Sequence, residues 1–275
     1  MCRWIAYNGQ PIFIEQLITL PEHSLVEQSM KTEMNFDTYG NLMNTNGDGF
    51  GVGWYGRRPK PGLFKEQTPA WSNENLREIC HQVRAHIFFA HVRATTTGAV
   101  QRTNSHPFKH QNWLFQHNGD VSEFEKIRRD LQFDIAPEFF PEIKGTTDSE
   151  TFFLLAVTYG LKDDPKLGMQ KMVERVKKAL DNNNIEKQYL NLSCAISDGE
   201  KIYTVRYAYG KPSKTQFYCT NSAIIHGLDE GEKKQGKNVI VVSEPLDKAH
   251  ENWTQIPDNS FAIIQKGEVR IETFI

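Results

Sequence analysis

The sequence predicts an α+β domain in which largely antiparallel sheets are covered by helices. Short segments rich in apolar, β-branched and aromatic residues occur along the whole chain, and segments with helical periodicity interrupt them. Asn8-Gly9 and Asp198-Gly199 each fall between two strand-like segments. These dipeptides favour type I′ hairpin turns, because both central residues need positive φ. Hairpins join antiparallel strands, so we expect the sheets to be largely antiparallel.

The expected strands fall into two groups along the chain. Those of the first half are Arg3–Tyr7, Pro11–Ile14, Phe50–Tyr55, His86–Arg93 and Trp113–Gln116. Those of the second half are Tyr189–Ser197, Lys201–Tyr207, Asn238–Ser243, Ser260–Gln265 and Glu268–Thr273.

Helical patterns lie between these strands. The expected helices are Ser24–Glu33, Asn73–Arg84, Glu123–Leu131, Asp148–Leu161 and Leu167–Asn182. Ser72 stands where it can cap the second helix. Ser122 with Glu125, and Thr147 with Glu150, have the spacing of capping boxes at the third and fourth.

The composition is that of a globular protein. The chain has 275 residues, 39% of them hydrophobic and 24% charged, which excludes fibrous and disordered classes for most of its length. The sequence contains no repeat and no long Pro/Gly/Ser linker, so we expect residues 1–275 to form a single domain.

The net charge of −2 argues against nucleic acid as a partner. Apolar stretches are too short to span a membrane and no secretory signal is evident, so we expect a cytoplasmic protein.

The four cysteines lack the paired spacing of zinc sites or disulfide frameworks. Cys80 belongs to the apolar stripe of an expected helix, Cys194 lies inside the strand-like run Leu192–Ile196, and Cys219 follows Phe217-Tyr218 in a similar setting, so core packing explains all three. Cys2 differs from them. Removal of Met1 ahead of so small a side chain would leave Cys2 as the first residue, with a free α-amine.

Two further patterns are weak signals for a bound cofactor. The glycine-rich segment Gly47–Gly53 runs into a strand rather than a helix, which argues against a dinucleotide site and favours close approach of the backbone to another group. His106 and His110 have helical spacing, but Pro107 separates them and no further ligand joins them. We therefore expect neither a metal nor another cofactor.

Three other places carry polar groups that have both a structural and a functional interpretation. Arg93 ends an expected strand, either as a surface charge or as a bidentate clamp for a carboxylate. Asn118-Gly119 resembles a turn after a strand, for which hairpin chemistry alone is sufficient. Asp148 opens a helix, where the macrodipole favours its charge without any ligand. Taken singly, each feature proves little.

Together with a terminal Cys2, these features match the requirements of amide-bond cleavage. A thiol attacks the carbonyl, and its own α-amine, with a pKa of roughly 7.7–8.0 in model compounds, can shuttle the proton. An asparagine amide and a glycine N–H can hold the oxyanion. An arginine and an aspartate can bind the two charged groups of an α-amino acid.

The order of these motifs resembles that of class II glutamine amidotransferases, which are N-terminal-nucleophile (Ntn) hydrolases, and in particular their stand-alone YafJ-like branch. The resemblance spans nearly the whole chain. It rests on the segments Met1–Arg3, Asn46–Tyr55, His91–Thr96, Asn104–Phe108, His117–Gly119, Thr147–Glu150 and Val242–Leu246, and on Trp253.

The resemblance implies a four-layer αββα sandwich of two largely antiparallel sheets, the Ntn-hydrolase fold. It implies that Cys2 is the nucleophile and that Asn118 and Gly119 form the oxyanion hole. It further implies that Arg93 binds the α-carboxylate of the substrate and Asp148 its α-ammonium group. Thr96 would help to line the glutamyl pocket.

Three functions remain open at this point. The first is hydrolysis of glutamine or another γ-glutamyl amide, a small-molecule substrate, with release of glutamate. The second is a glutaminase subunit that supplies ammonia to a separate acceptor or synthase protein, since the expected fold leaves no residues for an attached synthase. The third is a catalytically silent protein that binds γ-glutamyl compounds.

Overall fold

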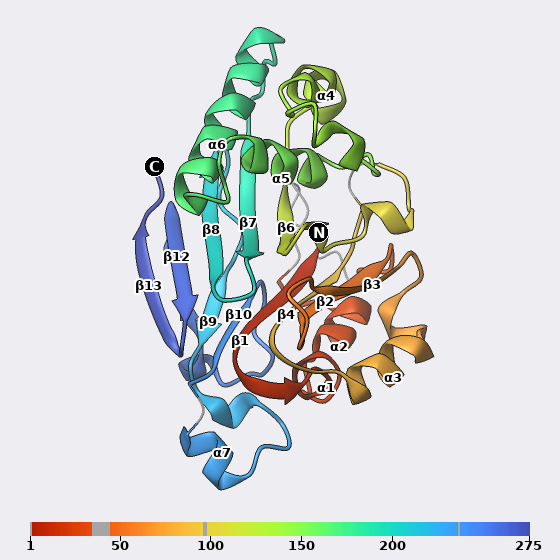
Figure 1. The fold of residues 1–275 in the computed structure, drawn as a ribbon, viewed down its shortest axis with the longest axis vertical. Coiled ribbons are helices and arrows are strands. Elements are labelled where there is room, and N and C mark those ends of the chain that lie inside the picture. The colour runs from red at the N-terminus through yellow and green to blue at the C-terminus, as the bar shows by residue number, and fades with distance from the viewer. Residues whose placement is uncertain (1, 35–44, 96–97, 236) are drawn as a thin grey trace.

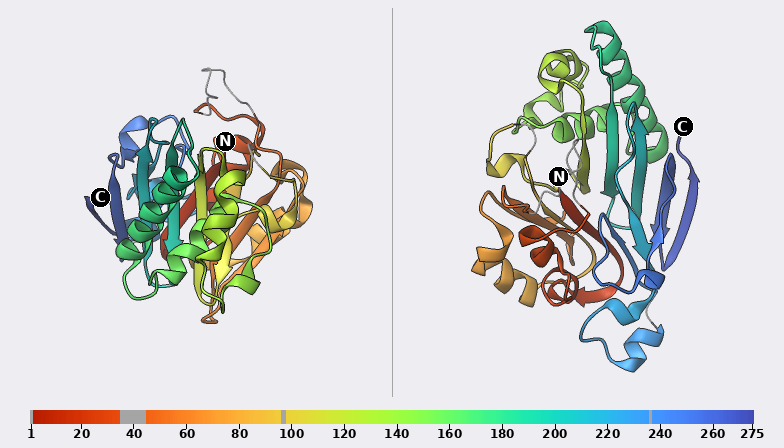
Figure 2. Two further views of the ribbon diagram at one scale, coloured as in Figure 1. Left: turned by 90° about the horizontal axis from the view of Figure 1, so that it is seen from above. Right: turned by 180° about the vertical axis from the view of Figure 1, so that it is seen from behind.

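The computed structural model describes residues 2–34, 45–95, 98–235 and 237–275. Two antiparallel sheets pack face to face and helices cover both outer faces, which gives the four layers of an αββα sandwich (Figures 1 and 2). The sheets and their covering helices are those of the expected fold class.

The first sheet has the strand order β11-β9-β10-β1-β4-β2-β3. Its strands are β1 (Arg3–Phe13), β2 (Phe50–Tyr55), β3 (Gly62–Glu66), β4 (Arg84–Val92), β9 (Phe217–Cys219), β10 (Val239–Val242) and β11 (Thr254–Gln255). The second sheet has the order β13-β12-β8-β7-β6-β5. Its strands are β5 (Phe108–His110), β6 (Trp113–Val121), β7 (Leu190–Ser197), β8 (Ile202–Tyr209), β12 (Ser260–Gln265) and β13 (Glu268–Thr273).

The helices are divided between the two outer faces (Figure 1). Those over the first sheet are α1 (Glu15–Ile18), α2 (Leu25–Met30) and α3 (Glu74–Gln82). Those over the second sheet are α4 (Phe124–Phe133), α5 (Asp148–Thr158) and α6 (Pro165–Asn182). The short helix α7 (Glu230–Gln235) lies at one end of the sandwich.

Apolar side chains fill the three spaces between the layers. One cluster lies between the second sheet and α4–α6, and another between the first sheet and α1–α3. The third lies between the two sheets and includes Trp4, Phe89, Leu114 and Val241. This division follows from the alternation of side chains along a strand, which gives each strand two buried faces.

Strand β1 lies inside the first sheet, with β10 on one side and β4 on the other. The expected hairpin at Asn8-Gly9 is wrong, because β1 continues through these residues. Asn8 still pairs with Val239 and Ile87, and only a shift in register toward β4 follows it. A Cβ on Gly9 would lie 2.2 Å from Oδ1 of Asn238, so this glycine allows a close side-chain approach rather than a turn.

Other local expectations had mixed outcomes. The bounds of β2, β12 and β13 agree with the expected strands, and the hairpin at Asp198-Gly199 joins β7 to β8. The Thr147 cap of α5 is present, since its side chain accepts from the N–H of Glu150. The cap of α3 is Asn73 and not Ser72. The Ser122 box at α4 is wrong, because that side chain bonds instead with the backbone of Tyr189.

The glycines of the segment Gly47–Gly53 permit close backbone contact, as expected. A Cβ on Gly51 would lie 2.1 Å from the carbonyl oxygen of His106, and one on Gly53 would lie 2.9 Å from Leu114. These contacts bring β2 against the segment that precedes β5 and against β6.

We expect Gly51→Ala to lower the free energy of unfolding by about 1–3 kcal/mol, because the added methyl group overlaps a backbone carbonyl and β2 must shift. Urea denaturation measures the change. Gly56→Ala is the matched control, since a Cβ there meets nothing within 4 Å, and its effect should stay within about 0.5 kcal/mol. Equal losses in the two variants would contradict this explanation of the glycine.

Candidate active site

Cys2 immediately precedes β1, and the start of this strand lies near β6 of the second sheet (Figure 1). Its thiol is partly exposed and its Sγ atom lies 3.7 Å from the carbonyl oxygen of Ala94. Arg3 pairs with Val92, so the next step of the ladder places Cys2 beside Arg93. Because Trp4 belongs to the core between the sheets, alternation turns the Cys2 side chain toward the second sheet as well.

Arg93 follows β4 and is almost completely buried. Its backbone bonds with the glycine-rich segment, since its N–H donates to Gly49 and its carbonyl accepts from Asp48. Its Nη1 atom donates to the carbonyl of Ala99 at 3.1 Å. Burial lowers the pKa of Arg93, and the nearby charges of Cys2, Asp48 and Asp148 oppose this shift. The guanidinium group therefore lies within electrostatic reach of both the predicted nucleophile and Asp148.

Asn118 and Gly119 lie inside β6, so the expected turn at this place is wrong. They pair with Ser193 and Leu192 of β7. The Asn118 side chain is buried, yet it makes no hydrogen bond with any described residue. A Cβ on Gly119 would lie 1.9 Å from the carbonyl oxygen of Asn191, so only glycine fits there. A strand, rather than a loop, holds the predicted oxyanion hole.

Asp148 is buried at the first turn of α5. Its Oδ1 atom accepts from the backbone N–H of Ser149 at 2.7 Å and lies 3.1 Å from that residue's hydroxyl. The Ser149 hydroxyl also lies 2.9 Å from Nδ1 of His117, whose Nε2 lies 3.1 Å from the carbonyl oxygen of Asn191. Burial raises the pKa of Asp148, and His117 opposes this shift. Within the described ranges Oδ2 has no hydrogen-bond partner, which leaves it able to accept from a ligand.

Asn104 joins the Arg93 and Asp148 segments, a role that the sequence did not reveal. Its Nδ2 donates to the carbonyl of Ala99 at 2.9 Å and to the hydroxyl of Thr146 at 3.0 Å. Its Oδ1 accepts from the N–H of Thr146 at 2.8 Å. Asn104 belongs to a motif that resembled the family, and that membership was the only available signal. Thr96, the remaining predicted site residue, lies outside the described residues.

Glu244 anchors the residue next to Cys2. Its carboxylate accepts from Arg3 Nε at 2.6 Å and from the hydroxyl of Thr32 at 2.7 Å, and it lies 2.7 Å from Nε2 of His23. The backbone N–H groups of residues 33 and 34 also donate to it. Arg3 in turn donates through Nη1 to the carbonyl of Cys2 at 2.8 Å. This buried ion pair fixes the peptide that carries the predicted nucleophile.

The pKa of Glu244 reflects these partners. Burial raises it, but the hydrogen bond with His23 and the charge of Arg3 outweigh burial and lower the pKa to about 2. Glu244 lies in the segment Val242–Leu246, which the sequence linked to the family without a role for this residue.

Three buried histidines lie next to the candidate site residues. The rings of His91 and His106 stack with centroids 4.1 Å apart, and His91 Nε2 lies 3.1 Å from the carbonyl oxygen of His117. Burial lowers the pKa of His91 to about 3 and also lowers that of His106 and His117. His110 contacts Glu142 instead. Among the residues that the structure describes, no group of three His, Cys, Asp or Glu side chains could hold a metal ion.

The other cysteines are core residues, as expected. Cys80, Cys194 and Cys219 are buried, and all four cysteines are free. Burial raises the pKa of Cys80 and Cys194 to about 12 and that of Cys219 to about 11. A thiol of such high pKa is a poor nucleophile near neutral pH, whereas Cys2 is partly exposed.

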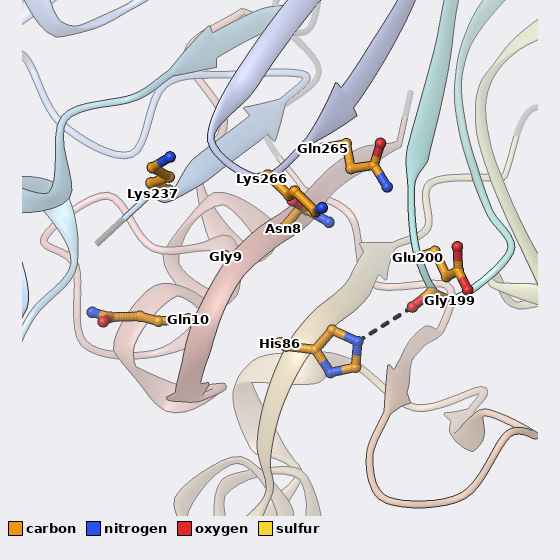
Figure 3. Close-up of a pocket in the computed structure, with 9 residues that line it drawn as sticks. All are labelled: Asn8, Gly9, Gln10, His86, Gly199, Glu200, Lys237, Gln265 and Lys266. Carbon is orange, nitrogen blue, oxygen red and sulfur yellow. Dashed lines mark hydrogen bonds between the residues drawn. The ribbon is translucent and has the colours of Figure 1, made fainter. Parts of the chain in front are cut away.

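An open pocket lies away from these residues. It has a volume of about 620 Å³ and is lined by Asn8–Gln10 in the far half of β1, by His86, by the β7–β8 and β12–β13 turns, and by Lys237 (Figure 3). The ring of His86 reaches across it to the carbonyl oxygen of Gly199 at 3.2 Å. No described residue of the predicted site lines this cavity.

The fold places this protein among the Ntn hydrolases, and the sequence comparison narrows the class. Residues 15–274 match the family described as glutamine amidotransferases class-II. The chain therefore belongs to the class II glutamine amidotransferases and is an enzyme of that family. None of the described helices combines the length and apolar character needed to cross a bilayer.

The chain is similar to three proteins that have been described. A protein of Saccharomyces cerevisiae described as probable glutamine amidotransferase DUG3 is 33% identical over 311 residues, which cover 100% of this chain and 85% of that protein. The solved structure of a glutamine aminotransferase class-II domain protein from Silicibacter pomeroyi has 31% identity and a TM-score of 0.74, with 99% of each chain covered. The gamma-glutamyl-hercynylcysteine sulfoxide hydrolase of Mycolicibacterium smegmatis is 30% identical over 122 residues, covering 44% of this chain and 52% of that protein.

We expect Glu244→Gln to destabilise the fold by about 3–5 kcal/mol at pH 7, because it leaves the Arg3 charge buried without a partner. The folded pKa of Glu244 lies below its ordinary value of 4.5. Its stabilising contribution is therefore complete above about pH 4.5 and is lost as the pH falls toward 2. The difference in unfolding free energy between wild type and variant should accordingly narrow over that range.

Urea denaturation at a series of pH values measures this difference. Glu251→Gln is the control, because Glu251 is exposed, and its effect should be small at every pH. If the difference in unfolding free energy between wild type and Glu244→Gln did not change with pH, the ion pair would not stabilise the fold.

Proposed function

We propose that this enzyme is an N-terminal-cysteine amidohydrolase that cleaves the γ-amide of glutamine or a related γ-glutamyl compound and releases glutamate. The observation that carries the proposal is the convergence of Cys2, Arg93, Asn118 and Asp148 at one end of the sandwich. Cys2 directly precedes β1 and Arg93 directly follows β4, Asn118 lies in β6 of the second sheet, and Asp148 starts α5. Family membership and the γ-glutamyl hydrolase among the relatives support the same chemistry.

The binding step uses the two charged groups of the glutamyl half. The planar guanidinium of Arg93 can hold the α-carboxylate through two parallel hydrogen bonds. Asp148 can accept a hydrogen bond from the α-ammonium group through Oδ2, while Ser149 keeps Oδ1 in place. Asn104 links the two backbone segments, so it sets the separation of the two charges that a donor must match.

The chemical step begins with removal of Met1, which frees the α-amine of Cys2. That amine takes the thiol proton as sulfur forms a bond to the γ-carbonyl carbon. The negative charge that develops on the carbonyl oxygen is stabilised by the Asn118 side-chain amide and the Gly119 N–H. Collapse of the tetrahedral intermediate breaks the C–N bond, and the α-ammonium group returns the proton to the leaving amine. Water then hydrolyses the thioester, which releases glutamate and restores the thiol.

The acceptor of the amine defines a second candidate. A separate synthase protein would receive ammonia if this chain were the glutaminase subunit of a two-protein enzyme, and such a partner would stimulate turnover.

We further propose that residues 1–275 act as one glutamine amidotransferase domain. The cytoplasm is the proposed location, which the four free cysteines support because thiols persist in reducing compartments.

Glutamate release should fall at least about a thousandfold in Cys2→Ala, because no other described thiol is placed to attack the donor. A coupled glutamate assay with glutamine and a γ-glutamyl dipeptide measures this loss. Cys80→Ala is the control and should retain turnover, since that thiol lies on the buried face of α3, in the core.

N-terminal mass analysis completes this test. Enzyme that keeps Met1 should be inactive, because the nitrogen of Cys2 is then a peptide nitrogen without basicity. Near-normal turnover of Cys2→Ala would overturn the proposed mechanism.

Arg93→Lys and Asp148→Asn should each lower kcat/KM by about 10–100-fold, since each removes a charge-assisted hydrogen bond to the glutamyl half. The lysine keeps the positive charge but loses the planar fork. Thr147 still caps α5 in Asp148→Asn, so the helix should remain. Steady-state kinetics and thermal melting separate the two roles. A change in melting temperature alone for Asp148→Asn would mean that this carboxylate only stabilises the start of α5.

A further inference from the structure

The segment 210–216 bridges the two sheets at the same end of the sandwich as Cys2. The N–H of Lys214 donates to Oδ1 of Asn191 on β7 at 3.1 Å, and Asn191 Nδ2 donates back to the carbonyl of Pro212 at 2.6 Å. The hydroxyl of Thr215 donates to the carbonyl of Ser243, just after β10, at 2.8 Å. Arg206 donates through Nε to the carbonyl of Lys214. These bonds fix the Lys214 backbone between β7 and the end of β10.

Both anchors are adjacent to the predicted catalytic groups. Asn191 is the residue whose carbonyl oxygen approaches Gly119 so closely that no Cβ fits. Ser243 bonds to Trp4, since its N–H donates to the Trp4 carbonyl and its hydroxyl accepts from the Trp4 N–H. Lys214 therefore lies beside both the oxyanion position and the first residues of β1. The charge of Cys2 accordingly acts on the Lys214 ammonium.

Lys214 and Arg93 lie on opposite sides of Cys2. In the first sheet β1 separates β4, which leads to Arg93, from β10, which leads to Ser243. In the second sheet β6 separates β5 from β7, which carries Asn191. A donor whose α-carboxylate binds Arg93 and whose γ-carbonyl reaches Cys2 can therefore extend its leaving amine on the side of Cys2 where the Lys214 segment lies.

The Lys214 ammonium has no ion pair or hydrogen bond in the described part of the chain. The neighbouring carboxylate of Asp120 is already bound by Lys211, whose Nζ lies 2.7 Å from both oxygens. Half-burial lowers the pKa of Lys214, Asp120 opposes the shift, and Lys211 and Arg3 add to it. The local excess of positive charge favours an anionic ligand.

We propose that Lys214 is a specificity-determining residue that binds a carboxylate in the leaving-amine half of the donor. The inference rests on the proposed function and refines its substrate class. The preferred donors are γ-glutamyl amino acids or peptides with a free carboxylate, and glutamine is a poorer donor because its leaving group is ammonia. Lys214 contacts no reacting atom, so it affects discrimination rather than bond cleavage.

The test compares γ-glutamylglycine with γ-glutamylglycinamide, which differ only in the charge of the leaving half, and uses glutamine as a third donor. In the wild type, kcat/KM should be about tenfold higher for the acid than for the amide, the size of one charge-assisted hydrogen bond. Lys214→Met should remove this preference by lowering kcat/KM for the acid about tenfold. Its values for the amide and for glutamine should stay within about twofold. The methionine keeps the backbone bonds of the segment.

Two control variants accompany this one. Lys214→Arg restores a cation and should restore most of the preference. Lys201→Met removes another half-buried lysine, at the opposite end of β8, and should leave the acid-to-amide ratio unchanged. A merely structural role of Lys214 would change kcat/KM for all three donors together.

The outcomes distinguish the inference from the function on which it rests. Equal use of acid and amide by the wild type, or parallel losses on both in Lys214→Met, would overturn the role of Lys214 while glutamate release still supports the amidohydrolase. Absence of glutamate release from all three donors would overturn the proposed function, and this inference with it.

Discussion

Strand β1 is an interior strand of its sheet, and the position of Cys2 depends on that placement. The strand pairs with β4 on one side and with β10 on the other, and β10 comes from residues 239–242. An edge strand has a partner on one side only, so its first residues can fray. The start of β1 is held instead by hydrogen-bonded strands on both sides and by the Arg3–Glu244 ion pair. The position of Cys2 therefore depends on contacts between the first strand and residues 239–244.

The sequence was most informative where chemistry and local structure coincide. Cys2, Arg93 and Asp148 could be singled out as candidate site residues because a thiol next to the N-terminus, an arginine at a strand end and an aspartate at a helix start are local features, and their roles stay predictions. Helix α5 was predictable for the same reason, since Thr147 and Glu150 are three residues apart. The fold class followed from periodicity and from the family resemblance, because alternating strands and amphipathic helices must bury their apolar faces in layers.

The sequence was least informative where distant partners decide the structure. Asn-Gly favours a turn, yet at Asn118 the neighbouring strand β7 outweighs that tendency and β6 continues. Glu244 is separated from Arg3 by 241 positions, and nothing in the local pattern of either residue indicates the other. Lys214 looks like an ordinary loop lysine until two hydrogen-bonded anchors, one from each sheet, place it beside Cys2.

The stacked histidines His91 and His106 make the stability of the folded enzyme depend on pH. In the unfolded chain imidazoles take up protons below about pH 6.5, but His91, with a folded pKa of about 3, stays neutral inside the protein. The stability that results from this difference between the folded and unfolded pKa values of His91 is complete above about pH 6.5. It is lost as the pH falls below that value, by up to about 1.4 kcal/mol per pH unit for one proton. His106 and His117 shift in the same direction. Mild acid therefore lowers the stability of the folded protein, and the architecture is suited to near-neutral surroundings.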